Sequence, residues 1–163
     1  MREAIFDVLM HHPTHAGDLE NTRVLDLFAG SGGLGIEALS RGAAEAHFVE
    51  RDQGAIRILR QNLKDLALTE RSTVWPLEAR RAVERLANAG LQFDVLLLDP
   101  PYAATEMTAQ ILHALTAAEL PAAGAVLVLE RAATNDNAPN VEGLGKPLIR
   151  RWGETEALFY CHD

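Results

Sequence analysis

The chain has few of the residues that build disulfide frameworks, metal clusters or membrane spans. Among its 163 residues there is one cysteine, Cys161, which excludes an internal disulfide and any site that needs several thiolates. No apolar run reaches the ~20 residues that a bilayer-spanning helix needs. The first ten residues include Glu3 and Asp7 and lack the basic-then-apolar layout of a signal peptide. We therefore expect a cytoplasmic protein without membrane contact, in which Cys161 is a packed thiol.

Basic residues are also in the minority. The chain has 15 Lys and Arg against 23 Asp and Glu, a formal net charge of -8. Taken alone, this balance argues against a nucleic-acid partner, because phosphate binding needs Lys and Arg. Arginines nevertheless gather in two places, at Arg80, Arg81 and Arg85 and at Arg150 and Arg151. Each group is either a local basic surface or an ordinary solvated face, and the sequence leaves both interpretations open.

Three histidines lie close together without the other ligands that a metal site needs. His11, His12 and His15 are interrupted by Pro13, with no thiolate or carboxylate at ligand spacing. We expect a loop after a first helix here, and no metal.

The remaining sequence predicts a single α/β domain over residues 1–163. Short apolar runs alternate with stretches of helical periodicity. The expected strands are 23–28, 46–50, 72–75, 93–98 and 123–130, and the expected helices 33–42, 53–66, 78–89 and 105–117. Such alternation predicts a mostly parallel sheet covered on both faces. After a polar loop at 132–145, runs at 147–152 and 155–161 predict an antiparallel hairpin.

A glycine-rich loop follows the first expected strand and opens the first helix after it. Glycines allow close backbone approach to a ligand, helix N-terminal amides face it, and ligands bind at this edge of open α/β sheets. The segment Gly30–Gly35 fits G-x-G-x-x-G, and Glu50 stands 20 residues after Gly30, where dinucleotide folds place their ribose-binding acid. A nicotinamide cofactor is therefore one candidate ligand.

S-adenosylmethionine is the other candidate. It also has ribose hydroxyls for Glu50, but it carries a sulfonium cation in place of a pyrophosphate. Asp26, just before the glycine loop, suits a cation better than a diphosphate. The alternative for Asp26 is a local capping role.

The fourth strand ends in Asp99-Pro100-Pro101-Tyr102. Prolines end the strand ladder, so the Asp99 carboxylate and the Pro100 carbonyl can face outward as two acceptors. An exocyclic amino group offers two N–H donors to match them, and Tyr102 offers a stacking surface worth ~1–3 kcal/mol. Hydrogen bonds to both acceptors would orient the amino group, localise its lone pair and accept its proton. The segment indicates N-methylation of a base. The alternative is that these residues only end the strand and have no catalytic role.

With these motifs, the chain resembles the RsmD family, the bacterial small-subunit (16S) ribosomal RNA guanine-N2 methyltransferases. The matching stretches are Arg2–Phe6, 24–43, Phe48–Glu50 and 96–102. The resemblance implies a class I methyltransferase fold, Rossmann-like, with a seven-stranded sheet and an antiparallel C-terminal hairpin. It also implies ribosomal RNA as the partner.

The resemblance assigns roles to particular residues. It implies S-adenosyl-L-methionine as cofactor, bound by Asp26, Phe28, Gly30, Gly32, Glu50, Glu78 and Ala79. Glu50 would bind the ribose hydroxyls, and Glu78, where the family more often has Asp or Asn, would face the adenine. The target guanine would be held by Asp99, Pro100 and Tyr102.

This sequence differs from the family at the N-terminus, because family members usually begin well upstream with a basic segment. Met1 stands where the family has valine, so we expect the native protein to start earlier. An intact mass near 17.8 kDa would contradict this.

Two alternatives stay open. DNA adenine-N6 and cytosine-N4 methyltransferases share the D-P-P-Y segment, but they usually carry a separate target-recognition region, for which 163 residues leave little room. A nicotinamide-dependent oxidoreductase, or a non-catalytic nucleotide-binding module, fits the glycine loop, but no hydride-transfer site accompanies it.

Overall fold

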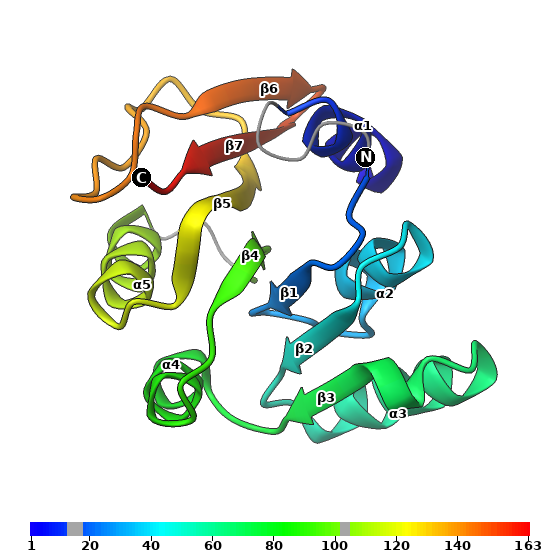
Figure 1. Ribbon diagram of the computed structural model, residues 1–163. Helices are drawn as coiled ribbons and strands as arrows, with labels where there is room; N and C mark the ends of the chain where they lie inside the picture. Colours follow the sequence, from blue (N-terminus) through cyan, green and yellow to red (C-terminus); the bar gives the residue numbers. More distant parts are fainter. Residues whose placement is uncertain (13–17, 102–104) are drawn as a thin grey trace.

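The computed structural model describes residues 1–12, 18–101 and 105–163 (Figure 1). Seven strands of this described chain form one sheet in the order β3-β2-β1-β4-β5-β7-β6. Their bounds are β1 Arg23–Asp26, β2 Glu45–Val49, β3 Ser72–Trp75, β4 Phe93–Leu98, β5 Pro121–Ala132, β6 Leu148–Trp152 and β7 Thr155–Cys161. The strands from β3 to β5 pair in parallel, whereas β7 runs antiparallel to both β5 and β6. The expected mostly parallel sheet with a C-terminal hairpin is confirmed.

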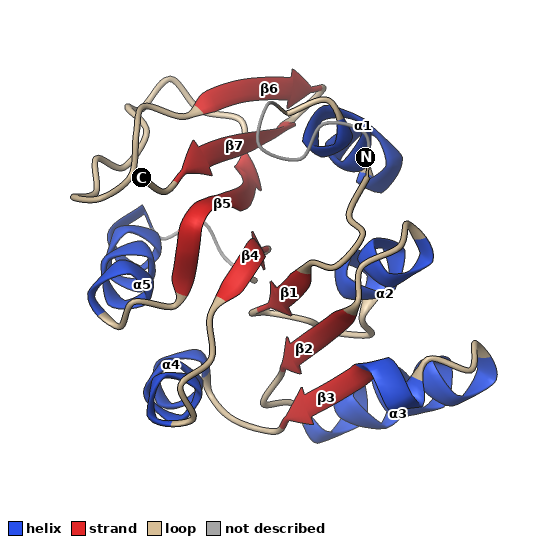
Figure 2. Cartoon of the chain, in the orientation of Figure 1, coloured by secondary structure: helices blue, strands red, loops and turns tan. Residues whose placement is uncertain are grey.

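Helices cover both faces of this sheet (Figures 1 and 2). They are α1 Arg2–Met10, α2 Gly33–Ser40, α3 Gln53–Asp65, α4 Ala79–Asn88 and α5 Thr105–Ala117, with a short 3-10 turn, η2, at Thr69–Arg71. Helices α1, α2 and α3 pack on one face and α4 and α5 on the other. None of the helices in the described part of the chain has the length and apolar character needed to span a bilayer.

The bounds of β1, β2, β5 and β6 differ by one or two residues from those expected from the sequence, and two of these differences have a clear structural cause. β1 ends at Asp26 rather than at residue 28, because Phe28 already belongs to the turn into the glycine loop. β5 continues past residue 130 to Ala132, since its last residues pair with β7, as in the pair Arg131–Glu156. This extension depends on a distant strand, which local sequence patterns do not reveal.

The central strands are buried on both faces, which explains their nearly continuous apolar sequences. The residues with no exposed surface include Val24, Leu25, Val95, Leu96, Val126 and Leu127. Because β1 and β4 are adjacent in the sheet, the segments that follow them leave the core at the same edge. This edge is where the glycine loop and Asp99 are found.

Helix α2 lies unusually close to β2. A Cβ on Gly35 would stand 2.3 Å from Cε1 of Phe48, so only glycine fits there without displacing the ring. The neighbouring helix α3 begins with a capping residue, Asp52, whose carboxylate accepts a 2.8 Å hydrogen bond from the Ala55 amide. Together these local features hold the N-terminal ends of both helices beside the carboxyl ends of β1 and β2.

Candidate functional site

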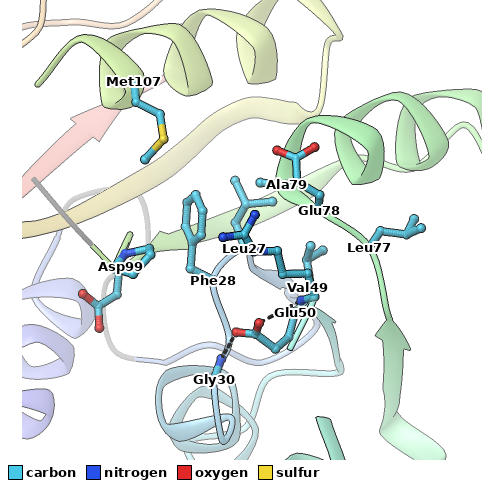
Figure 3. Close-up of a pocket in the computed structure, with 12 residues that line it drawn as sticks. Leu27, Phe28, Gly30, Val49, Glu50, Leu77, Glu78, Ala79, Asp99 and Met107 are labelled. Carbon is cyan, nitrogen blue, oxygen red and sulfur yellow. Dashed lines mark hydrogen bonds between the residues drawn. The ribbon is translucent and has the colours of Figure 1, made fainter. Parts of the chain in front are cut away.

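Two adjoining cavities open where the parallel strands end. The first, which we name the Glu50 cavity, has a volume of about 350 Å³ and lies between the glycine loop, the end of β2 and the start of α4 (Figure 3). The second, the Glu130 cavity, has a volume of about 360 Å³ and lies between the glycine loop, the start of α1 and the ends of β4 and β5. Phe28, Gly30 and Asp99 line both. The two cavities can therefore hold two parts of one ligand.

Glu50 is fixed at the wall of the Glu50 cavity by backbone amides. Its Oε1 accepts a 3.1 Å hydrogen bond from Gly30, and its Oε2 accepts bonds of 2.8 Å from Arg51 and 2.9 Å from Asp52. These contacts connect the glycine loop to the end of β2, as Figure 3 shows for Gly30. A carboxylate has about four acceptor positions. Roughly one therefore remains for a ligand hydroxyl.

The two glycines predicted to bind a cofactor differ in their surroundings. Gly30 lines both cavities and has φ +55°, with open space where a Cβ would lie. Gly32 has φ +93° and caps α2, and a Cβ there would stand 2.4 Å from Cδ1 of Leu59. Neither cavity has Gly32 in its lining, so this glycine contributes to the conformation of the loop rather than to a cavity wall. Its direct contact with a cofactor stays a prediction.

Asp26 is buried, with 1% of its surface exposed, and lies in the wall of the Glu130 cavity. Its Oδ2 accepts a 2.9 Å hydrogen bond from the Gly35 amide, which is the local capping role that the sequence left open. Its Oδ1 has no hydrogen-bond partner among the described residues. Burial raises the pKa of Asp26 to about 7, and the charges of Asp99 and Glu50 add to the rise. One carboxylate oxygen is thus free to receive a cation or a donor.

A second and a third acidic side chain line the same cavity. Asp99 and Glu130 directly follow Leu98 and Leu129, which are paired across β4 and β5. Partial burial raises the pKa of Asp99. The pKa of Glu130 is raised by burial first and then by the charge of Asp99. Sequence reasoning missed Glu130, although it ends the apolar run of the fifth strand at the edge where ligands bind.

The segment after Asp99 is described only in part. Pro101 lines the Glu50 cavity, and Pro100 is half-buried. Tyr102 lies outside the described residues, so its stacking role stays a prediction. The aromatic side chain that the structure does place at both cavities is Phe28.

The predicted adenine-facing pair begins α4. Glu78 is the N-cap residue of this helix, Ala79 is its first residue, and both line the Glu50 cavity. Leu77 and Met107 complete an apolar wall that could not be identified from the sequence (Figure 3). Met107 comes from α5, so its presence at the cavity depends on how that helix packs.

The arginine groups separate into side chains that bind another side chain and side chains that, in the described part of the chain, do not. Arg151 forms a 2.9 Å ion pair with Glu156, and Arg80 donates to the side chain of Gln110. Arg81, Arg85 and Arg150 are exposed and form no ion pair with any residue that the structure describes. Of these, only Arg81 lies in the first turn of α4, the helix whose first residue lines the Glu50 cavity.

The histidine segment contains no metal cluster within the described ranges. No group of three His, Cys, Asp or Glu side chains there could hold an ion, and His15 lies outside these ranges. Nε2 of His12 lies 3.4 Å from Sγ of Cys161. Burial raises the pKa of this half-buried cysteine, with a further contribution from Asp163, which keeps it a thiol.

Residues 1–161 match a family model described as Conserved hypothetical protein 95. The chain belongs to this family. Curated relatives include "Putative rRNA methyltransferase YlbH" of Bacillus subtilis, 44% identical over 102 residues, or 63% of this chain and 52% of the relative. Ribosomal RNA small subunit methyltransferase D of Escherichia coli is 35% identical over 102 residues, 63% of this chain and 46% of the relative. The matched stretch thus spans about half the length of these relatives, and the resemblance to the RsmD family is confirmed.

Solved structures match over nearly the whole chain. A conserved hypothetical protein of Streptococcus pyogenes is 34% identical with a TM-score of 0.87, and the match covers 100% of this chain and 96% of that one. A hypothetical protein of Thermus thermophilus is 31% identical with a TM-score of 0.77, over 97% of this chain and 82% of that one. The fold of this family member is therefore shared along its full described length.

Proposed function

We propose that this protein transfers a methyl group from S-adenosyl-L-methionine to the exocyclic N2 of a guanine in small-subunit ribosomal RNA. The proposal rests on one observation: Asp99 and Asp26, which has a carboxylate oxygen without a hydrogen-bond partner among the described residues, line the same cavity. Relatives named as ribosomal RNA small subunit methyltransferase D support the RNA substrate. The proposed site of action is the cytoplasm.

The two cavities fit the two ends of this cofactor. The Glu50 cavity combines apolar walls for an adenine ring with a carboxylate for the ribose hydroxyls. The Glu130 cavity carries three carboxylates, those of Asp26, Asp99 and Glu130. Such a wall favours a sulfonium and an ammonium group and opposes a pyrophosphate. The acidic cavity therefore favours S-adenosylmethionine over a dinucleotide.

When bound, S-adenosylmethionine supplies an electrophilic methyl group on a positively charged sulfur. The protein then has to position and prepare the amino nitrogen. Asp99 would accept one N–H of the guanine amino group, with the Pro100 carbonyl as the second acceptor. The raised pKa of Asp99 makes this carboxylate a better acceptor for the proton that must leave. Orientation of the nitrogen by fixed acceptors would supply much of the acceleration.

The proposal is tested by tritiated-methyl transfer from S-adenosylmethionine to three substrates in parallel: small subunits that lack the modification, naked ribosomal RNA and duplex DNA. Label recovered from RNA as N2-methylguanine is the expected result. Label in DNA would instead support an amino-methyltransferase acting on adenine N6 or cytosine N4. Absence of both labelling and cofactor binding would reopen the dinucleotide interpretation.

Replacement of Glu50 by alanine should weaken cofactor binding by about 1.5–3 kcal/mol, the usual cost of losing a hydrogen bond to a charged group. Isothermal titration calorimetry measures this directly. Because Glu50 also holds Gly30, thermal unfolding of the variant should be recorded alongside. Unchanged affinity would remove Glu50 from the cofactor site, and Glu70→Gln, on the exposed turn before β3, provides a control that should bind normally.

Cofactor binding should depend on pH through Asp26. Its pKa of about 7 in the free protein would fall when a cationic ligand binds, because the cation favours the ionised carboxylate. Binding near neutral pH should then release a proton, and the affinity should increase as the pH rises to about 7 and level off above it. Calorimetry in buffers of different ionisation enthalpy measures the released proton.

The matched variant is Asp26→Asn, which keeps the shape of the side chain and cannot ionise. It should lose the step in affinity near pH 7. Asp99 and Glu130, whose pKa values are also raised, are unchanged in this variant. Any pH dependence of affinity that they cause should therefore remain in Asp26→Asn. A step of the same size in the variant would mean that Asp26 is not the titrating group.

A further inference from the structure

Glu130 is an acidic residue of the site to which the proposed reaction gives no role beyond its negative charge. It lies near the end of β5, directly after Leu129, and lines the Glu130 cavity with Asp26 and Asp99. Its side chain is half-buried and forms no hydrogen bond or ion pair with any part of the chain that the structure describes. The carboxylate is thus available to a ligand in the cavity.

The arginine next to Glu130 in the sequence and the arginine that lines the cavity both have other partners. Arg131 follows it, but alternate residues of a strand point to opposite faces, and Nε of Arg131 donates a 2.8 Å bond to Glu156. Arg2 lines the same cavity, and its guanidinium lies 3.8 Å from Glu37. The amino group of Met1, which also lines this cavity, partly offsets the rise in the pKa of Glu130, but burial and the charge of Asp99 outweigh it, so the cavity stays acidic around Asp99 and Glu130.

A carboxylate next to the amino acceptor has a specific complement among the bases. Guanine places two donors side by side on its Watson–Crick edge, N1–H and N2–H, which match the two oxygens of one carboxylate. Adenine and cytosine place an unprotonated ring nitrogen, an acceptor, beside their amino groups. A carboxylate repels that acceptor, so it favours guanine through the ring nitrogen next to the amino group that is methylated. Bases splayed out of RNA are commonly bound through this edge.

We propose that one carboxylate oxygen of Glu130 accepts the N1–H of the target guanine and the other shares one N2–H with the Pro100 carbonyl, while Asp99 accepts the other N2–H, so that Glu130 restricts methylation to guanine. The inference rests on the proposed guanine-N2 activity and adds the residue that selects the base. Glu130 takes no part in bond making or breaking. It holds the base so that the nitrogen beside Asp99 is the one methylated.

The test uses 2-aminopurine, which keeps the 2-amino group of guanine but has an acceptor at N1. Small-subunit RNA is assembled with either base at the nucleotide that the wild-type protein labels, and methyl transfer to each is compared. The wild type should prefer guanine by about 100-fold or more, because a site built for a donor rejects an analogue that lacks it. Glu130→Gln should lower the rate on guanine and shrink this preference at least about tenfold, since the glutamine amide can donate to N1 of 2-aminopurine.

The controls separate this inference from the proposed function. Glu70→Gln should keep the wild-type preference. Glu130→Asp keeps two acceptor oxygens and should therefore keep the preference for guanine at a lower rate. It can be measured even if the glutamine variant does not fold. If the wild type methylates no guanine N2, the proposed function fails; if it does and Glu130→Gln shows an unchanged preference, only the role of Glu130 is overturned.

Discussion

Replacement of Asp99 by alanine should abolish methyl transfer while S-adenosylmethionine still binds. Asp99 directly follows β4 and is only partly buried, outside the core, so its removal leaves the core untouched. What is lost is the acceptor that orients the amino group and takes its proton. Groups in such a role typically contribute about 10²–10⁴-fold to the rate. A fall of about this size in kcat, measured by single-turnover methyl transfer, is the expected result.

Asp99→Asn is the sharper version of this experiment. Asparagine keeps the size of the side chain and one acceptor oxygen but replaces the other oxygen by a donor, which opposes the N–H groups of the base. Turnover should therefore remain low even where RNA still binds. Calorimetric cofactor affinity close to that of the wild type would show that the site is intact. Near-normal turnover in either variant would mean that Asp99 is not the acceptor.

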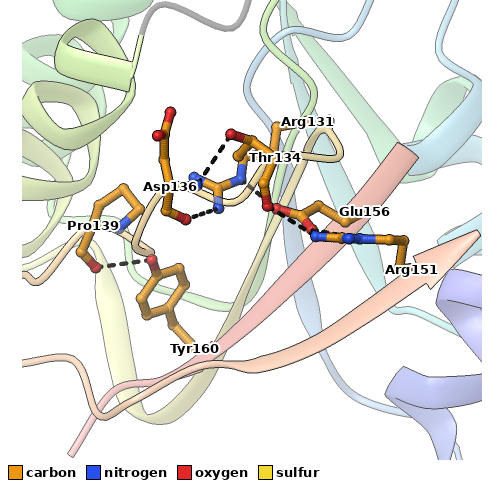
Figure 4. A network of polar contacts seen from close by, with 7 residues as sticks. All are labelled: Arg131, Thr134, Asp136, Pro139, Arg151, Glu156 and Tyr160. Carbon is orange, nitrogen blue, oxygen red and sulfur yellow. Dashed lines mark hydrogen bonds and ion pairs between the residues drawn. The ribbon is translucent and has the colours of Figure 1, made fainter. Parts of the chain in front are cut away.

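The second large effect is expected on stability, at Glu156 of β7. Only 1% of its surface is exposed, and its two oxygens accept separate bonds, 2.8 Å from Nε of Arg131 and 2.9 Å from Nη2 of Arg151 (Figure 4). Burial alone would raise the pKa of Glu156, but the bonds from Arg151 and Arg131 outweigh it and lower the pKa below its usual value. Glu156→Ala leaves the largely buried Arg131 unpaired and should lower the free energy of unfolding by on the order of 3 kcal/mol.

The same two arginines also hold the polar loop after β5. Arg151 donates a 2.8 Å bond to the Thr134 carbonyl and Arg131 a 3.3 Å bond to that of Asp136. The hydroxyl of Tyr160 donates a 2.9 Å bond to the Pro139 carbonyl and should still hold the loop further along (Figure 4). Hydrogen exchange in Glu156→Ala should therefore accelerate around residues 134–136 more than around Pro139.

Chemical denaturation measures the loss of stability, and Arg151→Ala is the matched control. Arg151 is half-exposed, so its removal should cost about 1 kcal/mol or less. The contribution of Glu156 to the free energy of unfolding should be present at neutral pH. It should disappear as the pH falls through the lowered pKa of Glu156 in the folded state, because protonation removes the charge that both arginines bind. Equal losses in both variants at neutral pH would contradict the pairing described for Arg131.

The parts of the fold and site that follow from local patterns could be predicted from the sequence. β3 and β4 have the expected bounds because each apolar run is closed by a turn or a proline. Glu50 and Asp99 lie at the carboxyl ends of their strands, as the motifs around them predict. Residues that reach the site only through tertiary packing could not be predicted in this way. Met107 depends on the docking of α5, and Glu130 on the register between β4 and β5.

The loop at 132–145 is a second case in which local sequence does not reveal the tertiary contacts. Its composition predicts an irregular segment, which the structure confirms from residue 133 onward, since Ala132 still belongs to β5. Yet Val141 has only 2% of its surface exposed, and Leu144 forms an isolated bridge with His162. The partners that order this loop come from β5, β6 and β7, so no window of the loop sequence contains the information. Long-range pairing, rather than loop composition, determines how it is held.

The three carboxylates around the Glu130 cavity also bear on how a catalytic cycle would end. Methyl transfer converts the sulfonium of the cofactor into a neutral thioether, so the product carries one positive charge less than the molecule that bound. In a cavity lined by Asp26, Asp99 and Glu130, that lost charge weakens the attraction for the spent cofactor. The acidic wall that favours loading would thereby favour release, and turnover would be driven by the change in charge that the reaction itself produces.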